Sequence, residues 1–440
     1  MMKSLQLECE SPLDNDAVRP HWRKIRLGEA FSLTKKPARL RYSDFERIPF
    51  VPMEAVPVGR MYFEQFTLKQ PSEVSSGTYF EPGDVLVAKI TPSFENGKQG
   101  IIEKLPTPFG VATTEVIPLK EAPGLSDKQF LFYYLLRQDV RTALAAKMEG
   151  STGRQRLSAG TLASWEIELP PLPEQRAIAR VLRTVQDAIQ ARRRELELER
   201  ERKAALMQHL FTHGTRGEPT KQTEIGEMPE SWQVVRLGDM ASISTGTTPA
   251  TDNPAYYSGT IPFVKTSEIA NSRITEAATR ITTDAVRDYG LKQYAPGTVV
   301  VAMYGQGKTR GQVAILDIAA TITQNTAAIV PNPELNSEFL WQWLMSQYEN
   351  LREAGHQGHI SHLNLGYVKQ YLVPLPSLAE QHQIADVLGV SGNKLVSLEG
   401  EMTLLQELFR ALLEELMTGR LSTLPLIEAE DEAATNGSRK

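Results

Sequence analysis

The chain of 440 residues contains the same order of segments twice, and this duplication limits the possible folds more than any other feature. Trp-Arg-Lys-Ile-Arg-Leu-Gly at 22–28 returns as Trp-Gln-Val-Val-Arg-Leu-Gly at 232–238, and Ile-Pro-Phe-Val at 48–51 returns at 261–264. Leu-Pro-Pro-Leu-Pro-Glu-Gln at 169–175 returns as Leu-Pro-Ser-Leu-Ala-Glu-Gln at 375–381. The matches keep their order while their offset drifts, as insertions in loops would cause. We therefore infer an internal repeat of one domain followed by one helix.

Each copy begins with a domain of mixed secondary structure. Short β-branched runs at 299–301, 313–316 and 327–330 lie between Gly- and Pro-containing turns, which predicts strands. Aromatic-rich segments at 129–137 and 338–348 predict short helices. Because strands and helices do not alternate regularly, we expect two repeated α/β domains of the α+β class.

A long helix follows each mixed domain, since apolar residues then recur at steps of three and four. The expected seams are Ile178, Leu182, Val185, Ile189, Leu196, Leu206 and Leu210 in the first helix, and Ile384, Leu388, Leu395, Leu398, Met402, Leu405, Phe409, Leu412 and Leu416 in the second. Such helices are too long for an ordinary core and too polar to span a membrane. We expect them to pair as an antiparallel coiled coil, which relates the two copies by a pseudo-twofold axis.

Polar residues interrupt the seams unequally. Arg192, Glu199 and Lys203 lie in the middle of the first seam, whereas Ser391 is the one interruption of the second. Two interpretations stay open. These three residues face a partner subunit or a bent region of the helix pair, or the helices pair tightly at their ends and the middle is hydrated. Residues 174–216 carry a net charge of +4 and residues 380–422 carry −4, which favours pairing of one helix with the other.

Composition sets the remaining limits. The predicted division is a first domain at 1–173, a helix at 174–216, a second domain at 217–379, a helix at 380–422 and a disordered acidic tail at 423–440. The net charge is −5, and the two domain segments carry +1 and −4, which excludes a stand-alone basic DNA-binding protein. One cysteine, no secretory signal and no long apolar run predict a cytoplasmic protein.

Several segments imitate catalytic motifs without their context. Residues 302–309 fit a loose phosphate-loop pattern, but a strand rather than a helix follows, which predicts a hairpin. Asn253 begins a segment close to an amino-methyltransferase loop, and a turn is the better interpretation. Glu81, Asp84 and Lys89 are residue types that a metal-dependent nuclease site uses. Their counterparts in the second copy include Thr298 and Met303, which cannot serve in such a site. His356, His359 and His362 lie in a Gly-rich loop without a nearby carboxylate, so we expect neither a metal nor a catalytic residue.

The chain resembles the specificity subunit of type I restriction–modification enzymes. The resemblance rests on Pro-Glu-Ser-Trp-x-x-x-Arg-Leu-Gly-Asp at 229–239, Ile-Pro-Phe-Val at 261–264 and Gly-x-x-Arg-Gly-Gln-Val-Ala at 307–314. It extends to the two Glu-Gln segments that open the long helices, and it covers nearly the whole chain in the order domain, helix, domain, helix.

This resemblance implies a non-catalytic subunit in which each recognition domain reads one half of a split target in double-stranded DNA. The paired helices would set the unread spacer and dock two modification (methyltransferase) subunits, which use S-adenosylmethionine to methylate adenine. Restriction (motor-nuclease) subunits would join and use ATP and Mg²⁺. No cofactor is expected on this chain itself.

The candidate DNA-binding residues lie in polar loops at matching places of the repeat, since two half-sites require matching placement. In the first copy they are Lys35, Lys36, Arg39, Arg41, Lys89, Ser93, Asn96, Lys98, Arg154, Gln155 and Arg156. In the second copy they are Thr247, Thr248, Lys265, Ser267, Tyr304, Gln306, Lys308, Arg310, Gln324, Asn325, His359 and His362.

Three other functions stay open at this stage. The chain could be a coiled-coil scaffold whose repeated domains bind protein, or a specificity subunit of a related restriction system with different catalytic partners. A fused enzyme with a hidden nuclease or methyltransferase activity is the third. Salt-sensitive DNA binding by the assembled complex would exclude the scaffold, because counterion release makes phosphate binding depend steeply on salt.

Overall fold

A computed structural model describes residues 21–151, 153–305, 308–354 and 363–429. The chain forms two compact units, of which unit 1 comprises 1–193 and 401–440 and unit 2 comprises 194–400. The division falls inside both long helices, α5 (Leu172–His213) and α11 (Leu378–Met417). Each unit therefore combines one mixed domain with a segment of each helix.

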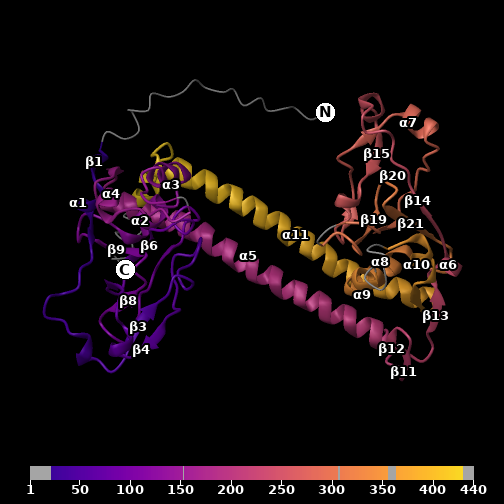
Figure 1. The fold of residues 1–440 in the computed structure, drawn as a ribbon, viewed down its shortest axis with the longest axis horizontal. Coiled ribbons are helices and arrows are strands. Elements are labelled where there is room, and N and C mark those ends of the chain that lie inside the picture. The colour runs from indigo at the N-terminus through magenta and orange to yellow at the C-terminus, as the bar shows by residue number, and fades with distance from the viewer. Residues whose placement is uncertain (1–20, 152, 306–307, 355–362, 430–440) are drawn as a thin grey trace. The chain divides into compact units, whose positions relative to one another are not determined.

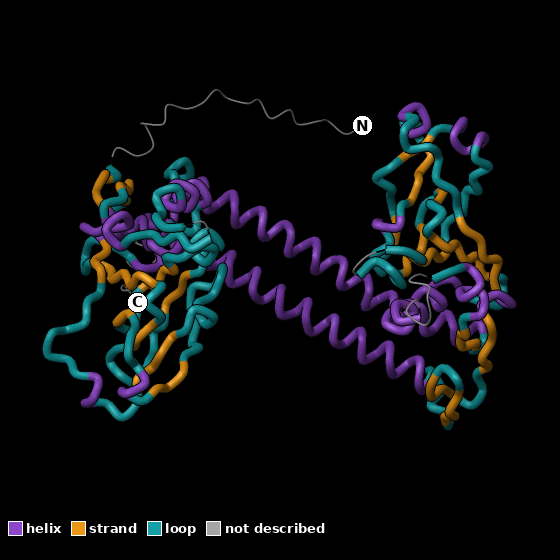
Figure 2. Tube along the Cα trace, in the orientation of Figure 1, coloured by secondary structure: helices purple, strands orange, loops and turns teal. Residues whose placement is uncertain are grey.

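Unit 1 contains two four-stranded sheets and a short strand pair (Figure 2). The sheets have the strand orders β2-β9-β6-β7 and β4-β3-β8-β5, and β1 pairs with β10. The strands are β1 (Arg23–Arg26), β2 (Phe31–Leu33), β3 (Ile48–Val51), β4 (Thr67–Lys69), β5 (Thr78–Phe80), β6 (Val85–Ala88), β7 (Gln99–Ile101), β8 (Gly110–Ala112), β9 (Val116–Glu121) and β10 (Glu166–Leu169). The short helices are α1 (Leu27–Ala30), α2 (Lys128–Tyr134), α3 (Gln138–Ala145) and α4 (Ala159–Ala163).

Unit 2 repeats this plan with a five-stranded sheet β14-β21-β18-β19-β16, a three-stranded sheet β17-β15-β20 and the pairs β13-β22 and β11-β12. Its strands are β11 (Thr220–Thr223), β12 (Gly226–Pro229), β13 (Gln233–Arg236), β14 (Ala241–Thr245), β15 (Ile261–Val264), β16 (Arg273–Ile274), β17 (Arg280–Ile281), β18 (Val299–Ala302), β19 (Val313–Leu316), β20 (Thr321–Ile322), β21 (Thr326–Pro331) and β22 (Leu372–Leu375). Its short helices are α6 (Leu237–Met240), α7 (Thr283–Asp288), α8 (Ser337–Ser346), α9 (Tyr348–Ala354) and α10 (Leu365–Gln370).

The predicted α+β class is confirmed. Most neighbouring strands are antiparallel, while β3 with β8, β15 with β20 and β16 with β19 run parallel. The three predicted strands correspond to β18, β19 and β21, and the two aromatic-rich segments form α2 and α8. The aromatic side chains of α2 and α8 are buried in the main core of each unit, which explains why these short segments are so apolar.

A buried Glu-Gln pair joins each mixed domain to the helix that follows it. At the start of α5, Glu174 accepts a hydrogen bond from Trp22 Nε1 at 3.1 Å and lies 2.8 Å from His21 Nε2. At the start of α11, Glu380 accepts from Trp232 Nε1 at 3.2 Å. Both glutamates are almost completely buried, so these bonds offset the cost of removing a carboxylate from water.

The glutamine of each pair holds the cap of the aromatic helix. Gln175 accepts from the backbone N–H of Asp127 at 2.9 Å, and Asp127 caps α2. Gln381 accepts from the backbone N–H of Asn336 at 2.7 Å, and Asn336 caps α8. Each glutamine amide also donates to two carbonyl oxygens, so its polar atoms are satisfied inside the core.

The repeated Arg-Leu-Gly segment requires glycine for close packing. A Cβ at Gly28 would lie 2.9 Å from the Cβ of Ala163 in α4, and a Cβ at Gly238 would lie 2.9 Å from the carbonyl oxygen of Lys369 in α10. Both glycines follow the strand that pairs with the last strand of their domain. The segment therefore allows the first strand and the last short helix of each domain to meet.

Within each unit, the segments of α5 and α11 run antiparallel, which confirms the predicted direction (Figure 1). In unit 1, Leu182 shares the main core with Leu416, and Arg192 forms an ion pair with Glu401 at 2.9 Å. In unit 2, Arg200 pairs with Glu399 at 2.6 Å, and Thr215 donates its backbone N–H to Glu380 at 2.9 Å. All predicted seam residues are buried or half-buried.

Polar residues of the first seam face α11, and the burial of Glu199 contradicts the interpretation that the middle of this seam is hydrated. Glu199 is 4% exposed and accepts a hydrogen bond at 2.7 Å from Ser391, the one polar residue of the second seam. Hydrogen bonds from Arg202 and Ser391 lower the pKa of Glu199 to about 2. Burial lowers the pKa of Lys203, and Gly392 on α11 leaves space beside its amine. A polar layer thus lies between the helices of unit 2.

The prediction of a disordered tail from residue 423 is wrong for its first residues. Thr423 is buried, and residues 424–429 form a helical turn in which the N–H of Leu426 donates to the carbonyl of Thr423 at 3.0 Å. Residues 430–440 lie outside the described residues.

No helix in the described ranges has both the length and the apolar surface that crossing a membrane requires.

We predict that Glu380→Ala destabilises unit 2 by about 2 kcal/mol, because the buried Nε1–H of Trp232 would lose its acceptor and the backbone N–H of Thr215 would lose a hydrogen bond. Urea unfolding at neutral pH, followed by tryptophan fluorescence, measures the effect. Glu407→Ala, at an exposed position of α11, is the control and should leave the midpoint unchanged. Equal midpoints for the two variants would contradict the proposed importance of this contact.

The low pKa of Glu199 predicts a contribution to stability that depends on pH. A carboxyl with a folded pKa of about 2 and an ordinary value of 4.5 stabilises the folded state above pH 4.5, and this contribution is lost as the pH falls toward 2. The difference in unfolding midpoint between the wild type and Glu199→Gln should therefore be larger at pH 7 than at about pH 3. Glu197→Gln, at an exposed neighbouring position, is the control. A difference independent of pH would argue against this assignment.

Candidate nucleic-acid interface

Polar loops of unit 2 gather at one end of its five-stranded sheet. Strands β14 and β18 both end where β21 begins, because Thr245 pairs with Ala327 and Ala302 pairs with Thr326. The backbone N–H of Thr248 donates to the side-chain oxygen of Gln324 at 3.1 Å. We call the polar residues at this end the unit 2 rim: Thr247, Thr248, Lys265, Ser267, Tyr304, Gln324 and Asn325.

Unit 1 has a rim at the corresponding end of its first sheet. Strand β2 ends with Leu33 opposite Leu119, and β6 ends with Ala88 opposite Val116, so both end where β9 begins. The unit 1 rim consists of Lys35, Lys36, Lys89, Glu115, Arg154, Gln155 and Arg156. An isolated antiparallel β-bridge pairs Ile90 with Arg156. It places Arg154, Gln155 and Arg156 at the same end of the sheet as Lys89.

The same backbone hydrogen bonds build the two rims. In unit 1 the N–H of Lys89 donates to the carbonyl of Glu115 at 2.9 Å, and in unit 2 the N–H of Met303 donates to the carbonyl of Asn325 at 3.0 Å. The backbone N–H of Thr113 also donates to the carbonyl of Val51, and in unit 2 the N–H of Thr323 donates to the carbonyl of Val264. One backbone frame therefore carries different side chains in the two units.

Side chains of the unit 1 rim are held in position by their neighbours. Arg156 donates two hydrogen bonds of 2.9 Å to the carboxylate of Glu115, and these bonds hold the pKa of Glu115 below its ordinary value. The amine of Lys36 lies 3.9 Å above the ring of Tyr42, which itself stacks on Phe109. The rim is thus cationic and partly preorganised.

The other predicted residues of unit 1 occupy nearby loops. Arg39 and Arg41 are exposed in the loop before β3, and Ser93 and Asn96 lie in the turn between β6 and β7. Lys98 is half-buried and donates to the carbonyl oxygen of Met53 at 2.8 Å, so its amine serves a structural contact.

In unit 2, Lys308 is exposed whereas Arg310 is only 8% exposed. The hydroxyl of Tyr348 in α9 donates to the carbonyl of Lys308 at 2.7 Å, which holds this hairpin loop on the helix. The sequence placed Arg310 on the surface because it lies in a polar turn, but the chain folds its side chain inward. Gln306, His359 and His362 lie outside the described residues.

The segments that imitate catalytic motifs have structural roles. Residues 299–302 and 313–316 form the antiparallel pair β18–β19, so the phosphate-loop pattern is a hairpin as predicted. Asn253 accepts from the N–H of Ala255 at 3.2 Å and caps a short turn. Asp84 is buried and accepts from the backbone N–H of Glu81, which in turn pairs with Lys120.

Sequence reasoning overlooked one histidine pair. His209 and His213 lie one turn apart on α5, and their ring centroids are 4.9 Å apart. The i, i+4 spacing could have revealed them. Within the described part of the chain, however, no three His, Cys, Asp or Glu side chains gather as a metal site would need.

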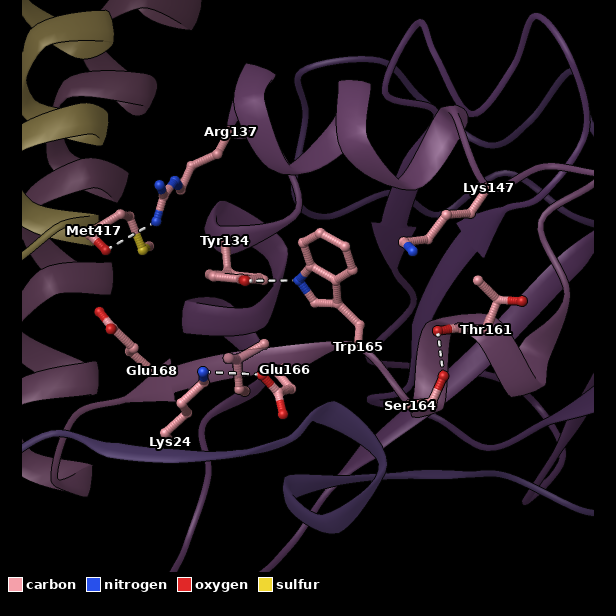
Figure 3. A pocket seen from close by; sticks show the side chains of 11 residues that line it. Lys24, Tyr134, Arg137, Lys147, Thr161, Ser164, Trp165, Glu166, Glu168 and Met417 are labelled. Atoms are coloured by element: carbon pink, nitrogen blue, oxygen red, sulfur yellow. Dashed lines mark hydrogen bonds and ion pairs between the residues drawn. The ribbon is translucent and has the colours of Figure 1, made fainter.

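A polar pocket of about 550 Å³ lies in unit 1 beside the strand pair β1-β10 (Figure 3). Trp165 Nε1 donates to the hydroxyl of Tyr134 at 2.9 Å, and Arg137 donates to the carbonyl of Met417 at 3.1 Å. A pocket of about 330 Å³ occupies the corresponding place in unit 2, where Trp343 and Tyr371 replace Tyr134 and Trp165. The two pockets share a position and differ in charge.

A twice-repeated α+β domain joined to paired helices, with polar loops at one end of a sheet in each copy, defines a recognition protein of duplicated design. Residues 20–200 and 229–408 match the family model of the type I restriction modification DNA specificity domain. The chain belongs to this family, whose members are the non-catalytic DNA-recognition subunits of type I restriction–modification systems.

Individual relatives are similar over most of their length. The MjaVIII type I restriction enzyme specificity subunit of Methanocaldococcus jannaschii is 24% identical over 328 residues, which cover 71% of this chain and 74% of that protein. The solved S subunit of a type I restriction–modification system from M. genitalium has a TM-score of 0.60 at 15% identity, covering 90% of this chain and 96% of that chain. A chain solved for the assembly and conformational transition of a type I R-M system has a TM-score of 0.53 at 19% identity, covering 91% and 99%.

We predict that Gly246→Ala lowers the stability of unit 2 by about 3 kcal/mol, because a Cβ there would lie 1.7 Å from the carbonyl oxygen of Ile322. Gly246 connects β14 to the rim threonines, so the rim should be distorted as well. Gly400→Ala, in α11 with no atom within 4 Å, should instead raise stability by about 1 kcal/mol. Urea unfolding of the wild type and the two variants measures both changes in the free energy of unfolding. A Gly246→Ala variant as stable as the wild type would refute the steric argument.

Proposed function

We propose that each rim contacts one half of a bipartite DNA target, while the helix pair sets the spacer between the halves and docks two modification subunits. The observation that carries this proposal is the repeated sheet end, built by the same backbone bonds but carrying different side chains. Duplex DNA has twofold symmetry, so two copies of the same backbone arrangement can contact two half-sites in the same way. Different side chains on the two copies would then recognise different base sequences.

The two rims differ in their chemistry. The unit 1 rim carries lysine and arginine side chains, which bind phosphates and hydrogen-bond guanine. The unit 2 rim carries Gln324 and Asn325 among hydroxyl groups, and amide side chains pair best with adenine. Because the two domain segments carry little or negative net charge, the partner subunits supply most of the phosphate neutralisation.

The chemical steps belong to the partner subunits in this proposal. The modification subunits use S-adenosylmethionine to methylate adenine, and restriction subunits use ATP and Mg²⁺ to cleave unmodified DNA in the cytoplasm. This chain supplies base reading and spacing.

We predict that Gln324→Ala combined with Asn325→Ala alters one half of the methylated motif and leaves the other half unchanged. Each lost base contact should cost about 1 to 3 kcal/mol of discrimination. The chain and its modification subunit are expressed in cells without adenine methylation, and methylated sites are found by sequencing the methylome. Glu230→Ala, at an exposed position before β13 and outside both rims, is the control and should keep the wild-type motif.

A motif altered in both halves, or left unaltered, would contradict the assignment of the unit 2 rim. The scaffold alternative predicts that the wild-type complex yields no split motif and shows no salt-sensitive binding to DNA. Measuring the affinity of the assembled complex over a range of salt concentrations therefore separates the two functions.

A further inference from the structure

The guanidinium of Arg156 in the unit 1 rim has one side bound and one edge open. Its Nε donates to Oε2 of Glu115 and its Nη2 donates to Oε1, both at 2.9 Å. Because Nε and Nη2 lie on the same side of the planar group, the carboxylate occupies that side. Nη1 has no hydrogen-bond acceptor among the described residues, and about half of the side chain is exposed. Arg156 therefore keeps the N–H groups of its outer edge, one on each Nη atom, for a ligand.

The backbone around this ion pair is fixed by neighbouring segments. The N–H of Arg156 donates to the carbonyl of Glu149 at 2.8 Å, and the N–H of Glu149 donates back at 3.0 Å. The next residue, Leu157, is fully buried and donates its N–H to the carbonyl of Lys89 at 2.7 Å. The carbonyl of Glu115 accepts from the N–H of Lys89 at 2.9 Å. Arginine and glutamate are thus connected to the same residue at the end of β6, so little freedom of the guanidinium remains to be lost on binding.

The charges around this edge suit a nucleic acid. The hydrogen bonds from Arg156, together with the nearby charge of Lys89, hold the pKa of the Glu115 carboxyl below its ordinary value. The carboxyl is therefore ionised at neutral pH, and the charges of the three side chains sum to +1. The glutamate consequently orients the arginine without making this part of the rim repel phosphate groups.

Arg273 of unit 2 shows what a purely structural arginine looks like in the same chain. Its Nε and Nη2 donate to the carboxylate of Asp317 at 2.8 and 2.6 Å, as in the unit 1 pair. Its Nη1, however, donates to both oxygens of Glu338 at 2.8 and 2.9 Å. Asp317 follows β19 at the end of the sheet where β18 begins, which is opposite to the unit 2 rim. Here the outer edge is occupied by the protein itself.

We propose that Arg156 recognises a guanine in the half-site read by unit 1, and that Glu115 is the residue that positions it. The outer edge of an arginine offers two parallel N–H groups, which match the O6 and N7 acceptors of guanine in the major groove. Adenine has an amino donor in place of O6, and neither pyrimidine offers two adjacent acceptors in this groove. This inference rests on the proposed function and assigns one base of its target to a named side chain.

The test measures the affinity of the assembled complex, the full-length chain with its modification subunits, for short DNA duplexes. The methylated motif of the wild type supplies the target, and each base pair of one half is replaced in turn. The half of unit 1 is the one that the variant Gln324→Ala with Asn325→Ala leaves unchanged. Replacing one guanine–cytosine pair should weaken binding of the wild type roughly 5- to 150-fold. Arg156→Ala should no longer distinguish the bases at that position, and it should keep its discrimination at all other positions.

Glu115→Gln tests the positioning role. A glutamine offers one acceptor oxygen in place of two, so the preference should fall at the same base pair, by less than in Arg156→Ala. The unfolding midpoint should stay close to that of the wild type, because exposed ion pairs contribute little stability. Arg273→Ala is the matched control: it should lower the unfolding midpoint and keep the wild-type preference at every position.

Several outcomes would overturn the assignment. Arg156→Ala could weaken binding equally for all duplexes, which would make this side chain a phosphate contact, or it could abolish binding, which exceeds the loss of one base contact. A unit 1 half-site without a guanine–cytosine pair would also contradict it, as would a Glu115→Gln variant that changes another position or none. If the wild type itself yields no split motif, the proposed function fails instead, so the two failures are distinguishable.

Discussion

The buried Glu-Gln pair at the start of each long helix is the contact on which the rest of each unit depends. Its glutamate binds the tryptophan that precedes the first strand, and its glutamine holds the cap of the aromatic helix. One point therefore connects the beginning of the domain, its core helix and the helix that leaves it. A buried carboxylate without these donors would be costly, so the three elements are fixed together.

The contacts around the Glu-Gln pair recur in both units, whereas the side chains on the rims differ between the units. The Glu-Gln pair, the Arg-Leu-Gly segment and the backbone bonds of the sheet end recur in both units. The side chains on the rims differ at corresponding positions: Lys89 and Glu115 of unit 1 correspond to Met303 and Asn325 of unit 2. Such a division allows a family to keep one fold while its members read different DNA sequences.

Particular residues show how far sequence reasoning reached. Three strands, two short helices and the two helix seams were predicted from periodicity, which is local in sequence, and the duplication was predicted from repeated segments. Glu199 could not be placed in this way, because its partner Ser391 lies on the other helix and is distant in sequence. The burial of Arg310 depends on side-chain packing inside a turn that the sequence marks only as polar.

The sequence by itself determined that this chain is a duplicated α+β domain with two long helices, and its motifs indicated the family before any coordinates were considered. Repetition and hydrophobic spacing carry that information because each copy must bury the same faces. Only the tertiary structure decided that the helix seam contains a polar layer in unit 2, that the Glu-Gln and Arg-Leu-Gly segments connect elements of each domain, and which loop residues share a rim. Those facts depend on contacts between residues remote in sequence, and no local pattern encodes them.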